Sequence, residues 1–146
     1  MASLVDTNIL VYRCDPRDPL KRRAALEILR TGEISGDLRI PHQALVEFVN
    51  SVTRPRGREA SIMNLADATR QAELFLEEFP VLYPNESVFR MALLGQAAYR
   101  FSWYDAHLWA YAEHYGLPEI LSEDFQHGRK FGNVRIRNPF LSAGLA

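Results

Sequence analysis

Short apolar segments alternate along the chain with longer stretches in which apolar residues recur every three or four positions. The short segments are typical of buried strands and span residues 2–6, 38–40, 81–83, 119–121 and 134–136. The longer stretches predict helices after residue 6 and over residues 19–29, 42–52, 61–79, 86–99 and 102–115. Short strands separated by helices favour a parallel sheet covered on both faces. We therefore expect an α/β fold, a three-layer sandwich around a central parallel sheet of about four or five strands.

Local signals set several boundaries of these elements. Gly32 is expected to stop the helix that starts at Pro19, and Asn85 is expected to cap the helix over 86–99. Proline and glycine indicate a loop over residues 54–58. The spacing in the helix over 61–79 predicts an inward apolar face formed by Leu65, Ala68, Ala72, Phe75 and Phe79.

Length and composition fit a globular protein. With 146 residues, 47% of them hydrophobic, the chain can bury a core as one domain over residues 1–146. No apolar run approaches the roughly 18 residues that span a membrane, and the first residues lack the basic region of a signal peptide. Cys14 is the only cysteine, which fits a reducing cytoplasm. We expect a cytoplasmic protein without a membrane partner.

The charges are unevenly distributed although the formal net charge is only −1. Of the 17 cationic residues, 15 are arginine, the side chain best shaped to bind phosphate. Arg54, Arg56 and Arg58 crowd one predicted loop, where they could contact a nucleic-acid backbone. The simpler interpretation of such a cluster is a solvated surface, and the sequence alone does not separate the two.

Four acidic residues lie in unusual places. Asp6 and Asp124 each follow a predicted strand, at the end of the strand where open α/β sheets place their functional sites. Glu47 and Asp105 stand inside otherwise apolar helical stretches. Each has a structural explanation of its own: a helix cap, a capping box or a solvated position. A shared site would explain all four at once.

The chemistry of such a site is restricted by its donor atoms. Oxygen ligands without cysteine or a histidine pair suit Mg²⁺ or Mn²⁺, and the four histidines have no zinc spacing. Neighbouring carboxylates repel one another, and a bound cation removes that repulsion. Two divalent ions would add four positive charges to the formal charge of −1 and give +3, which is compatible with a phosphate polymer as substrate.

Four segments together carry a resemblance to a known family. They are VDTNIL at 5–10, ALVEF at 44–48, WYDAHLWAYA at 103–112 and LSEDF at 121–125. In this order and spacing the chain resembles PIN-domain ribonucleases, and within them the VapC-like toxins of type II toxin–antitoxin pairs. The resemblance implies the PIN-like α/β sandwich and one acidic site. Its catalytic and metal-binding residues would be Asp6, Glu47, Asp105 and Asp124.

The resemblance also implies roles for the site residues. Asp6 and Asp105 would be the principal metal ligands, and Asp124 and Glu47 would bind one or two ions directly or through water. Two polar residues would orient these carboxylates by hydrogen bonds, and three basic residues would hold the RNA. They are Asn8 and Ser122, and Arg54, Arg56 and Arg58. A helix cap is the alternative role for Ser122.

Three further features leave alternatives open. His107 is expected to be packed or exposed rather than to touch substrate. Glu123 ranks below Asp124 as a ligand, because adjacent residues in a turn point apart. Aromatic residues near Asp105 could stack on bases, but Tyr104 has core spacing with Leu108 and Tyr111, so its burial is expected.

The leading hypothesis is a Mg²⁺- or Mn²⁺-dependent endoribonuclease that cleaves RNA phosphodiester bonds. The resemblance implies that it is a toxin, that a small cognate antitoxin inhibits it, and that it forms a homodimer. A PIN-domain nuclease of RNA processing without an antitoxin is one alternative, and a catalytically inactive RNA-binding scaffold is another. A phosphoacceptor module is disfavoured because the third predicted strand ends in Tyr83-Pro84 rather than in an aspartate.

Overall fold

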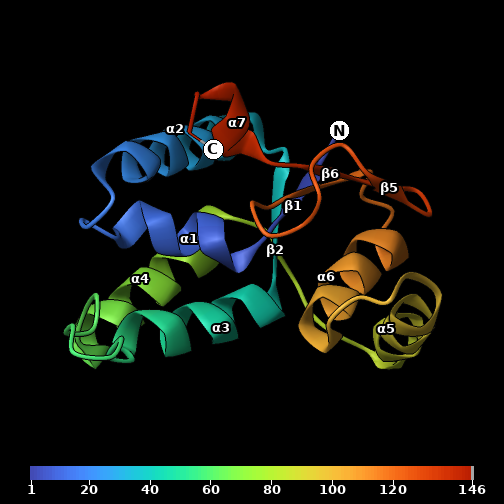
Figure 1. Ribbon diagram of the computed structural model, residues 1–146, viewed down its shortest axis with the longest axis horizontal. Coiled ribbons are helices and arrows are strands. Elements are labelled where there is room, and N and C mark those ends of the chain that lie inside the picture. The colour runs from blue at the N-terminus through green and yellow to red at the C-terminus, as the bar shows by residue number, and fades with distance from the viewer. Residues whose placement is uncertain (146) are drawn as a thin grey trace.

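The computed structural model describes residues 1–145, which form a sheet between two layers of helices (Figure 1). The sheet has six strands in the order β3-β2-β1-β4-β6-β5. Their bounds are β1 Ser3–Val5, β2 Leu38–Pro41, β3 Val81–Leu82, β4 Glu119–Leu121, β5 Lys130–Phe131 and β6 Val134–Arg137. All neighbouring strands are parallel except β5 and β6, which pair antiparallel. The expected three-layer α/β sandwich with a central parallel sheet is confirmed.

The sheet has one strand more than the pattern of apolar segments predicts. The additional strand, β5, contains only Lys130 and Phe131, and it pairs through Lys130↔Arg135 and Phe131↔Val134. Only Phe131 is buried, so the segment has no apolar run or alternation that would reveal a strand. Its place in the sheet comes from the hairpin with β6 rather than from its own sequence.

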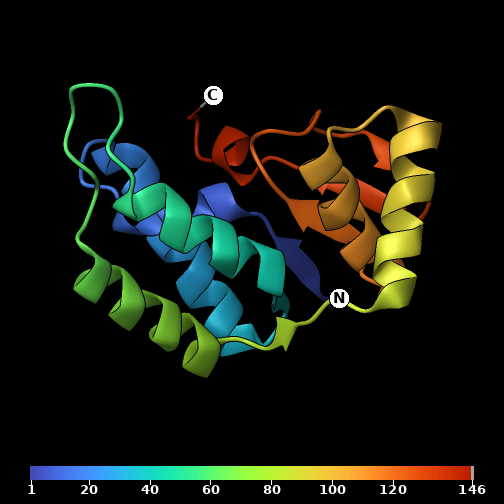
Figure 2. The same cartoon turned by 90° about the horizontal axis from the view of Figure 1, so that it is seen from below.

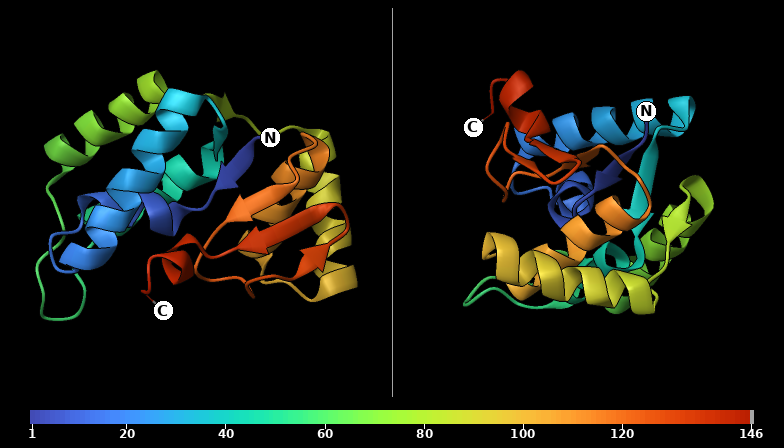
Figure 3. Two further views of the ribbon diagram at one scale, coloured as in Figure 1. Left: turned by 90° about the horizontal axis from the view of Figure 1, so that it is seen from above. Right: turned by 90° about the vertical axis from the view of Figure 1, so that its right-hand side faces the viewer.

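Within residues 1–145, seven helices flank the sheet. They are α1 Thr7–Cys14, α2 Pro19–Ser35, α3 His42–Thr53, α4 Leu65–Glu78, α5 Glu86–Tyr99, α6 Trp103–His114 and α7 Pro139–Ser142. Figure 2 and the left panel of Figure 3 show α5 and α6 on one side of the molecule and α1 to α4 on the other. None of the helices within residues 1–145 is both long enough and apolar enough to cross a membrane.

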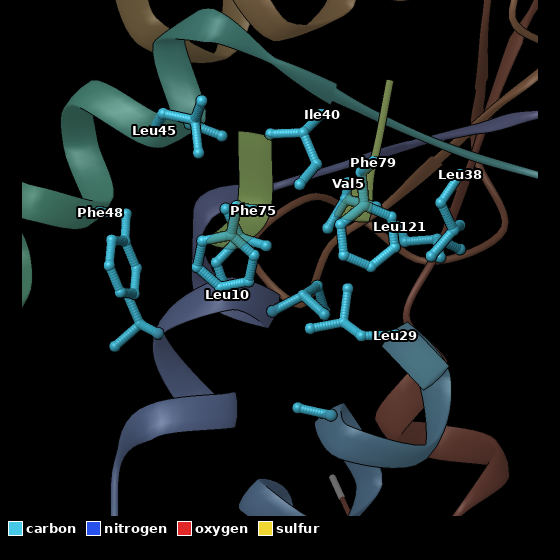
Figure 4. Packing of buried hydrophobic residues seen from close by; sticks show 14 of the residues in the cluster. Val5, Leu10, Leu29, Leu38, Ile40, Leu45, Phe48, Phe75, Phe79 and Leu121 are labelled. Atoms are coloured by element: carbon cyan, nitrogen blue, oxygen red, sulfur yellow. The ribbon is translucent and has the colours of Figure 1, made fainter. Parts of the chain in front are cut away.

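Each face of the sheet buries its own hydrophobic cluster, because successive side chains of a strand point to opposite faces. Leu4 packs with residues of α5 and α6, whereas its neighbour Val5 packs with residues of α1 to α4. Ile120 and Leu121 of β4 divide between the faces in the same way. Figure 4 shows the second of these clusters around Val5, Leu10 and Phe75. The two clusters hold β1 and β4 side by side at the centre of the sheet.

Three local predictions need correction. The helix that starts at Pro19 continues through Gly32 and ends at Ser35, where Gly36 forms the C-cap with a positive φ of 74°. Gly32 is buried against Leu38, where a Cβ would overlap the leucine side chain, so this glycine serves helix–strand packing. The helix predicted over 61–79 begins only at Leu65, after the N-cap Asn64, and Leu65 is 65% exposed rather than part of the inward face. Tyr104, at 66%, is also exposed rather than buried.

Candidate active site

Asp6 lies at the junction of β1 and α1. Its carboxylate accepts a hydrogen bond from the backbone N–H of Thr7 at 2.6 Å, so it caps the helix. Its own backbone N–H donates to the carbonyl of Leu121 at 3.0 Å, which joins the ends of β1 and β4. Leu4 and Val5 before it and Ile9 and Leu10 after it are fully buried, and Asp6 itself is only 4% exposed. The two apolar runs thus hold a carboxylate at the carboxyl end of the central strand.

Ser122 and Asn8 connect Asp6 to Asp124. The Ser122 hydroxyl donates to Oδ2 of Asp6 at 2.6 Å and accepts from the backbone N–H of Asp124 at 3.1 Å. The Asn8 side-chain amide lies 3.3 Å from Oδ2 of Asp6 and 3.1 Å from Oδ2 of Asp124, and donates to both. Ser122 is fully buried, whereas Asp124 is exposed. The network leaves one carboxylate enclosed and the other facing solvent.

Asn8 also carries an unsatisfied acceptor. Its side-chain oxygen Oδ1 is the one buried side-chain nitrogen or oxygen among residues 1–145 that has no hydrogen-bond partner. Because its amide nitrogen faces two carboxylates, the nitrogen and oxygen cannot be exchanged without placing like acceptors against each other. A buried acceptor without a donor costs about 1–3 kcal/mol and calls for a functional explanation.

Glu47 reaches the same place from α3. Its Oε2 accepts a hydrogen bond from the Thr7 hydroxyl at 2.6 Å, and its Oε1 accepts from the Gln43 amide at 3.1 Å. Gln43 also donates to the backbone carbonyl of Tyr104 at 3.1 Å, which ties α3 to the first turn of α6. Asp105 is in that first turn, with its N–H bonded to the hydroxyl of the N-cap Ser102 at 3.2 Å. This hydrogen bond is one of the two that a capping box between Ser102 and Asp105 would contain, so the structural alternative for Asp105 is present in part.

The charges of these acids act on one another. The pKa of Asp6 is raised from its ordinary value of 3.8 to about 7, mainly by burial and also by the negative charges of Asp124 and Glu47, although hydrogen bonds from Ser122 and Thr7 act to lower it. Burial also raises the pKa of Asp105, and the charges of Asp124 and Glu47 again add to the effect. The fold therefore brings the four acids into one electrostatic cluster.

The side chains of Glu123 and His107 make their contacts away from the other acids. The Glu123 carboxylate binds the Lys21 ammonium at 2.9 Å and the Tyr12 hydroxyl at 2.5 Å, on the α1–α2 side of the loop. His107 lies with Nδ1 2.9 Å from the carbonyl of Trp103, and its ring packs edge-on against the indole at 4.3 Å between centroids. The expectation that adjacent residues 123 and 124 point apart agrees with these contacts.

Two pockets flank the acids. The Asp124 pocket, of 280 Å³, is lined by Thr7, Asn8, Val11, Tyr12, Asp15, Ser51, Arg56, Glu123 and Asp124. The Tyr104 pocket, of 730 Å³, is lined by Thr7, Val46, Glu47, Asn50, Ser51, Arg54 and Tyr104. Arg56 and Arg54 thus each border one pocket, whereas Arg58 borders neither. None of the seven ion pairs within residues 1–145 involves these three arginines.

The loop over residues 54–58, with Arg54, Arg56 and Arg58, is followed by Glu59, which forms an ion pair with Arg17. The sequence did not single out Arg17. Arg17 binds the buried carboxylate of Asp15 at 2.9 Å and the carboxylate of Glu59 at 2.9 Å. Thr7, Gln43 and Lys21 were also not predicted to support the site. For Gln43 a signal existed, because it stands four residues before Glu47 on the same helix face. For Thr7 and Lys21 the partner is far away in the sequence, as is Glu59 for Arg17, and no local pattern reveals these contacts.

The donor set suits a hard cation that keeps part of its water. As the side chains stand, no three histidine, cysteine, aspartate or glutamate residues within 1–145 are grouped closely enough to hold a metal ion by themselves. Mg²⁺ commonly binds one or two carboxylates and retains several waters, so it needs no closed cage of protein ligands. The four carboxylates, with the unpartnered Asn8 oxygen beside them, supply only oxygen atoms, which fits such an ion.

Solved structures with the same fold include several toxin–antitoxin proteins. The DNA-bound VapBC complex of Salmonella typhimurium matches with a TM-score of 0.70 and 14% identity, over 95% of this chain and 99% of that chain. VapBC2 of Rickettsia felis, bound to a promoter DNA fragment, matches with a TM-score of 0.68 and 13% identity, over 94% and 98%. VapC20 of Mycobacterium tuberculosis, a toxin that cleaves the sarcin–ricin loop, matches with 0.65 and 16%, over 84% and 90%. At these identities the likeness establishes the fold.

A family model identifies the chain more directly. The model of the PIN domain matches residues 3–130, from the first residue of β1 to the first residue of β5, and so includes all four acids. No curated protein matches this sequence. The family match supports a nuclease, that is, a hydrolase. The chain belongs to the PIN domain family.

Proposed function

We propose that this chain is a metal-dependent endoribonuclease that cleaves RNA phosphodiester bonds, and that it is the toxin of a toxin–antitoxin pair. The observation that supports the proposal most is the near-complete burial of Asp6 at the carboxyl end of β1, where the charges of Asp124 and Glu47 raise its pKa as they also raise that of Asp105. A buried carboxylate among other carboxylates is costly unless a cation or a proton compensates its charge.

Mg²⁺ or Mn²⁺, as one or two ions, is the proposed cofactor. Asp6 and Asp105 would be its principal protein ligands, and Asp124 and Glu47 would complete the site directly or through water. When bound, such an ion stabilises charge on phosphate oxygens and makes a water molecule more acidic. Ser122 and Asn8 keep the Asp6 and Asp124 oxygens turned toward each other through the hydrogen bonds described above.

The basic residues of the loop would hold the substrate. Arg54 and Arg56 border the two pockets on either side of Thr7, so their guanidinium groups are available to phosphates on both sides of the acids. Arg58, which borders neither pocket, would add only general attraction for the RNA. The Arg17 bridge to Glu59 would keep this loop close to the site.

The proposed partners are a small antitoxin and a second copy of the chain. Support comes from the neighbours of this fold, since two of them are VapBC complexes. Helix α4 exposes Leu65, Leu74 and Leu76 to solvent at 65%, 40% and 48%, which supports a partner on that helix. The protein would act in the cytoplasm as one domain.

RNA cleavage by the purified full-length protein, freed of any partner, tests the proposal. A random-sequence RNA pool is incubated with Mg²⁺, with Mn²⁺ and with chelator, and new RNA ends are sequenced. We expect cleavage that needs the metal and that disappears in Asp6→Asn. Asp37→Asn is the matched control, because Asp37 is exposed and precedes β2 at the opposite end of the sheet. Cleavage that survives both chelator and Asp6→Asn would contradict the proposed site.

A further inference from the structure

Tyr104 is exposed beside the acids without a packing role. Among residues 1–145 it is the most exposed aromatic side chain, at 66%. Leu108 and Tyr111 share its spacing on α6 but are 2% exposed, so the core face of the helix begins after Tyr104. A large apolar ring left in water gives no stability to the fold and is available to a ligand.

The position of Tyr104 is fixed relative to the acids. It precedes Asp105 in the first turn of α6, which the Ser102 hydroxyl caps. The Gln43 amide donates to the Tyr104 carbonyl and to the Glu47 carboxylate, both at 3.1 Å. The backbone of Tyr104 is therefore fixed at the rim of the acidic cluster, and no large loop movement is needed to bring the residue there.

The remaining lining of the Tyr104 pocket suits a nucleotide. At 730 Å³ the pocket has the volume of a small-molecule site. Val46, 56% exposed, adds apolar surface, and Asn50 offers an amide that can both donate and accept hydrogen bonds. Arg54 adds a guanidinium that takes part in none of the ion pairs within residues 1–145. An aromatic ring, an amide and a cation match the three parts of a nucleotide: base face, base edge and phosphate.

The pocket is continuous with the acidic cluster. Thr7 and Ser51 line both the Tyr104 pocket and the Asp124 pocket, and Glu47 lines the Tyr104 pocket directly. A polymer that crosses the acids would thus have a recess on each side, each bordered by one arginine. Of the two recesses, only the Tyr104 pocket is large and carries an exposed aromatic ring.

We propose that the Tyr104 pocket binds an unpaired RNA base next to the phosphate that is cleaved, with Tyr104 stacking on that base. The inference rests on the proposed ribonuclease function and adds to it a base subsite. Single-stranded RNA is the substrate class that fits, because a base can stack on a side chain only when it is released from its own helix. Asn50, at the edge of the base, is the residue placed to discriminate between bases.

The test compares Tyr104→Ala and Tyr104→Phe with the wild-type full-length chain. The substrate is an unstructured oligoribonucleotide recovered from the cleaved pool, prepared intact and with an abasic ribose at each position around the cut. We measure KM and kcat, and we also measure RNA affinity by fluorescence anisotropy in the Asp6→Asn background. Tyr83→Ala is the matched control, because Tyr83 is 53% exposed but lies outside the pocket.

We expect Tyr104→Ala to weaken RNA affinity and to raise KM about fivefold to a hundredfold, the range that stacking on an aromatic side chain provides. Tyr104→Phe keeps the aromatic ring and should therefore have the RNA affinity and the KM of the wild type. One abasic position should weaken wild-type binding to the same extent and should abolish the difference between wild type and Tyr104→Ala. The position at which the abasic ribose has this effect identifies the base that stacks on Tyr104.

Three results would overturn the inference. The first is an unchanged affinity and KM in Tyr104→Ala while the wild type cuts RNA, which leaves the ribonuclease function intact. The second is weaker binding of a partner protein by Tyr104→Ala with unchanged RNA affinity, which would make the pocket a protein-docking site. The third is a wild-type protein that neither binds nor cuts RNA, which overturns the ribonuclease function as well.

Discussion

The acidic cluster has an enclosed half and an open half. In the enclosed half, Asp6 is 4% exposed and receives hydrogen bonds from the Thr7 backbone, the Ser122 hydroxyl and the Asn8 amide. In the open half, Glu47 and Asp105 are partly exposed on helices, and only side chains hold the Glu47 carboxylate. The first half is fixed by strand topology and the second by contacts between helices. We infer that the enclosed half provides the main negative charge of the site and that the open half modulates this charge.

The largest expected difference between the halves is in RNA cleavage. Asp6→Asn should lower kcat/KM about a thousandfold or more, because an amide cannot provide the negative charge that holds a cation. Glu47→Gln should lower it about tenfold to a hundredfold, since Thr7 and Gln43 can still hold the amide in place. Both variants are measured on the same oligoribonucleotide at saturating Mg²⁺.

The variant Asp105→Asn tests whether the loss of cleavage depends on the burial of the substituted carboxylate or on its proposed role as a metal ligand. We expect it to behave like Asp6→Asn, because Asp105 is proposed as a principal ligand although it lies in the open half. An equal loss in Glu47→Gln and Asp6→Asn would contradict the division into two halves.

The second difference concerns stability and pH in the metal-free protein. The folded protein holds a proton on Asp6 up to a pKa of about 7, whereas the unfolded chain releases it near 3.8. The stabilising contribution is therefore complete below about pH 4 and is lost as the pH rises to about 7. Between about pH 5 and 6.5 the free energy of unfolding should fall by about 1.4 kcal/mol per pH unit from this residue.

Urea unfolding in the presence of chelator, at several pH values from 5 to 8, measures this slope. Asp6→Asn should remove most of it, because the amide does not titrate. Asp105 contributes in the same direction, since burial raises its pKa as well. Asp15 contributes in the opposite direction but at lower pH, because hydrogen bonds from Arg17 lower its pKa. A wild-type slope of zero across this window would show that Asp6 is ionised in the folded protein.

The enclosed half was the more predictable from sequence. Asp6 follows a predicted strand, and a carboxylate between two apolar runs already indicates a special role. The strand positions were accurate because fully buried runs such as Leu4-Val5 and Ile120-Leu121 leave few alternatives. The roles of Asn8 and Ser122 were implied by the resemblance of the segments VDTNIL and LSEDF to PIN-domain ribonucleases rather than by a local pattern.

The open half depends on contacts that a linear pattern cannot reveal. The bond between Thr7 and Glu47 joins residues 40 positions apart, and the bond between Gln43 and Tyr104 joins residues 61 apart. Tyr104 was expected to be buried from its spacing, but the core face of α6 begins one turn later because the chain enters the helix at Ser102 from the surface. Gly32 was expected to end a helix, but its missing side chain serves contact with Leu38 instead.

Substitution of one serine in each half, Ser122 and Ser102, tests the difference between the halves further. Ser122→Ala removes a buried hydroxyl that donates to Asp6 and accepts from the Asp124 N–H, so Oδ2 of Asp6 keeps only the longer hydrogen bond from Asn8 and the Asp124 N–H loses this acceptor. We expect a loss of about 1–3 kcal/mol in the free energy of unfolding and a tenfold to hundredfold loss of cleavage. Ser102→Ala removes an exposed N-cap and should cost about 1 kcal/mol, with a smaller effect on cleavage. Equal losses of cleavage in the two variants would argue against a special role for Ser122.

The smallest expected effect lies at the outer edge of the enclosed half, where Lys21 and Tyr12 hold Glu123 away from the acids. Lys21→Met keeps most of the side-chain volume over the rings of Tyr12 and Phe140 but removes the cation that Glu123 binds. Because both charged side chains are about one-fifth exposed, at 18% and 20%, the loss of stability should be about 1 kcal/mol.

The more informative result of Lys21→Met is the metal dependence of cleavage. Without the Lys21 cation, the Glu123 carboxylate could turn toward Asp124, add negative charge and change the Mg²⁺ concentration needed for half-maximal cleavage. Lys21→Arg should restore the wild-type metal dependence, and Glu123→Gln in the Lys21→Met background should do so as well. If the double variant keeps the altered metal dependence, Lys21 acts on the site by another route than through Glu123.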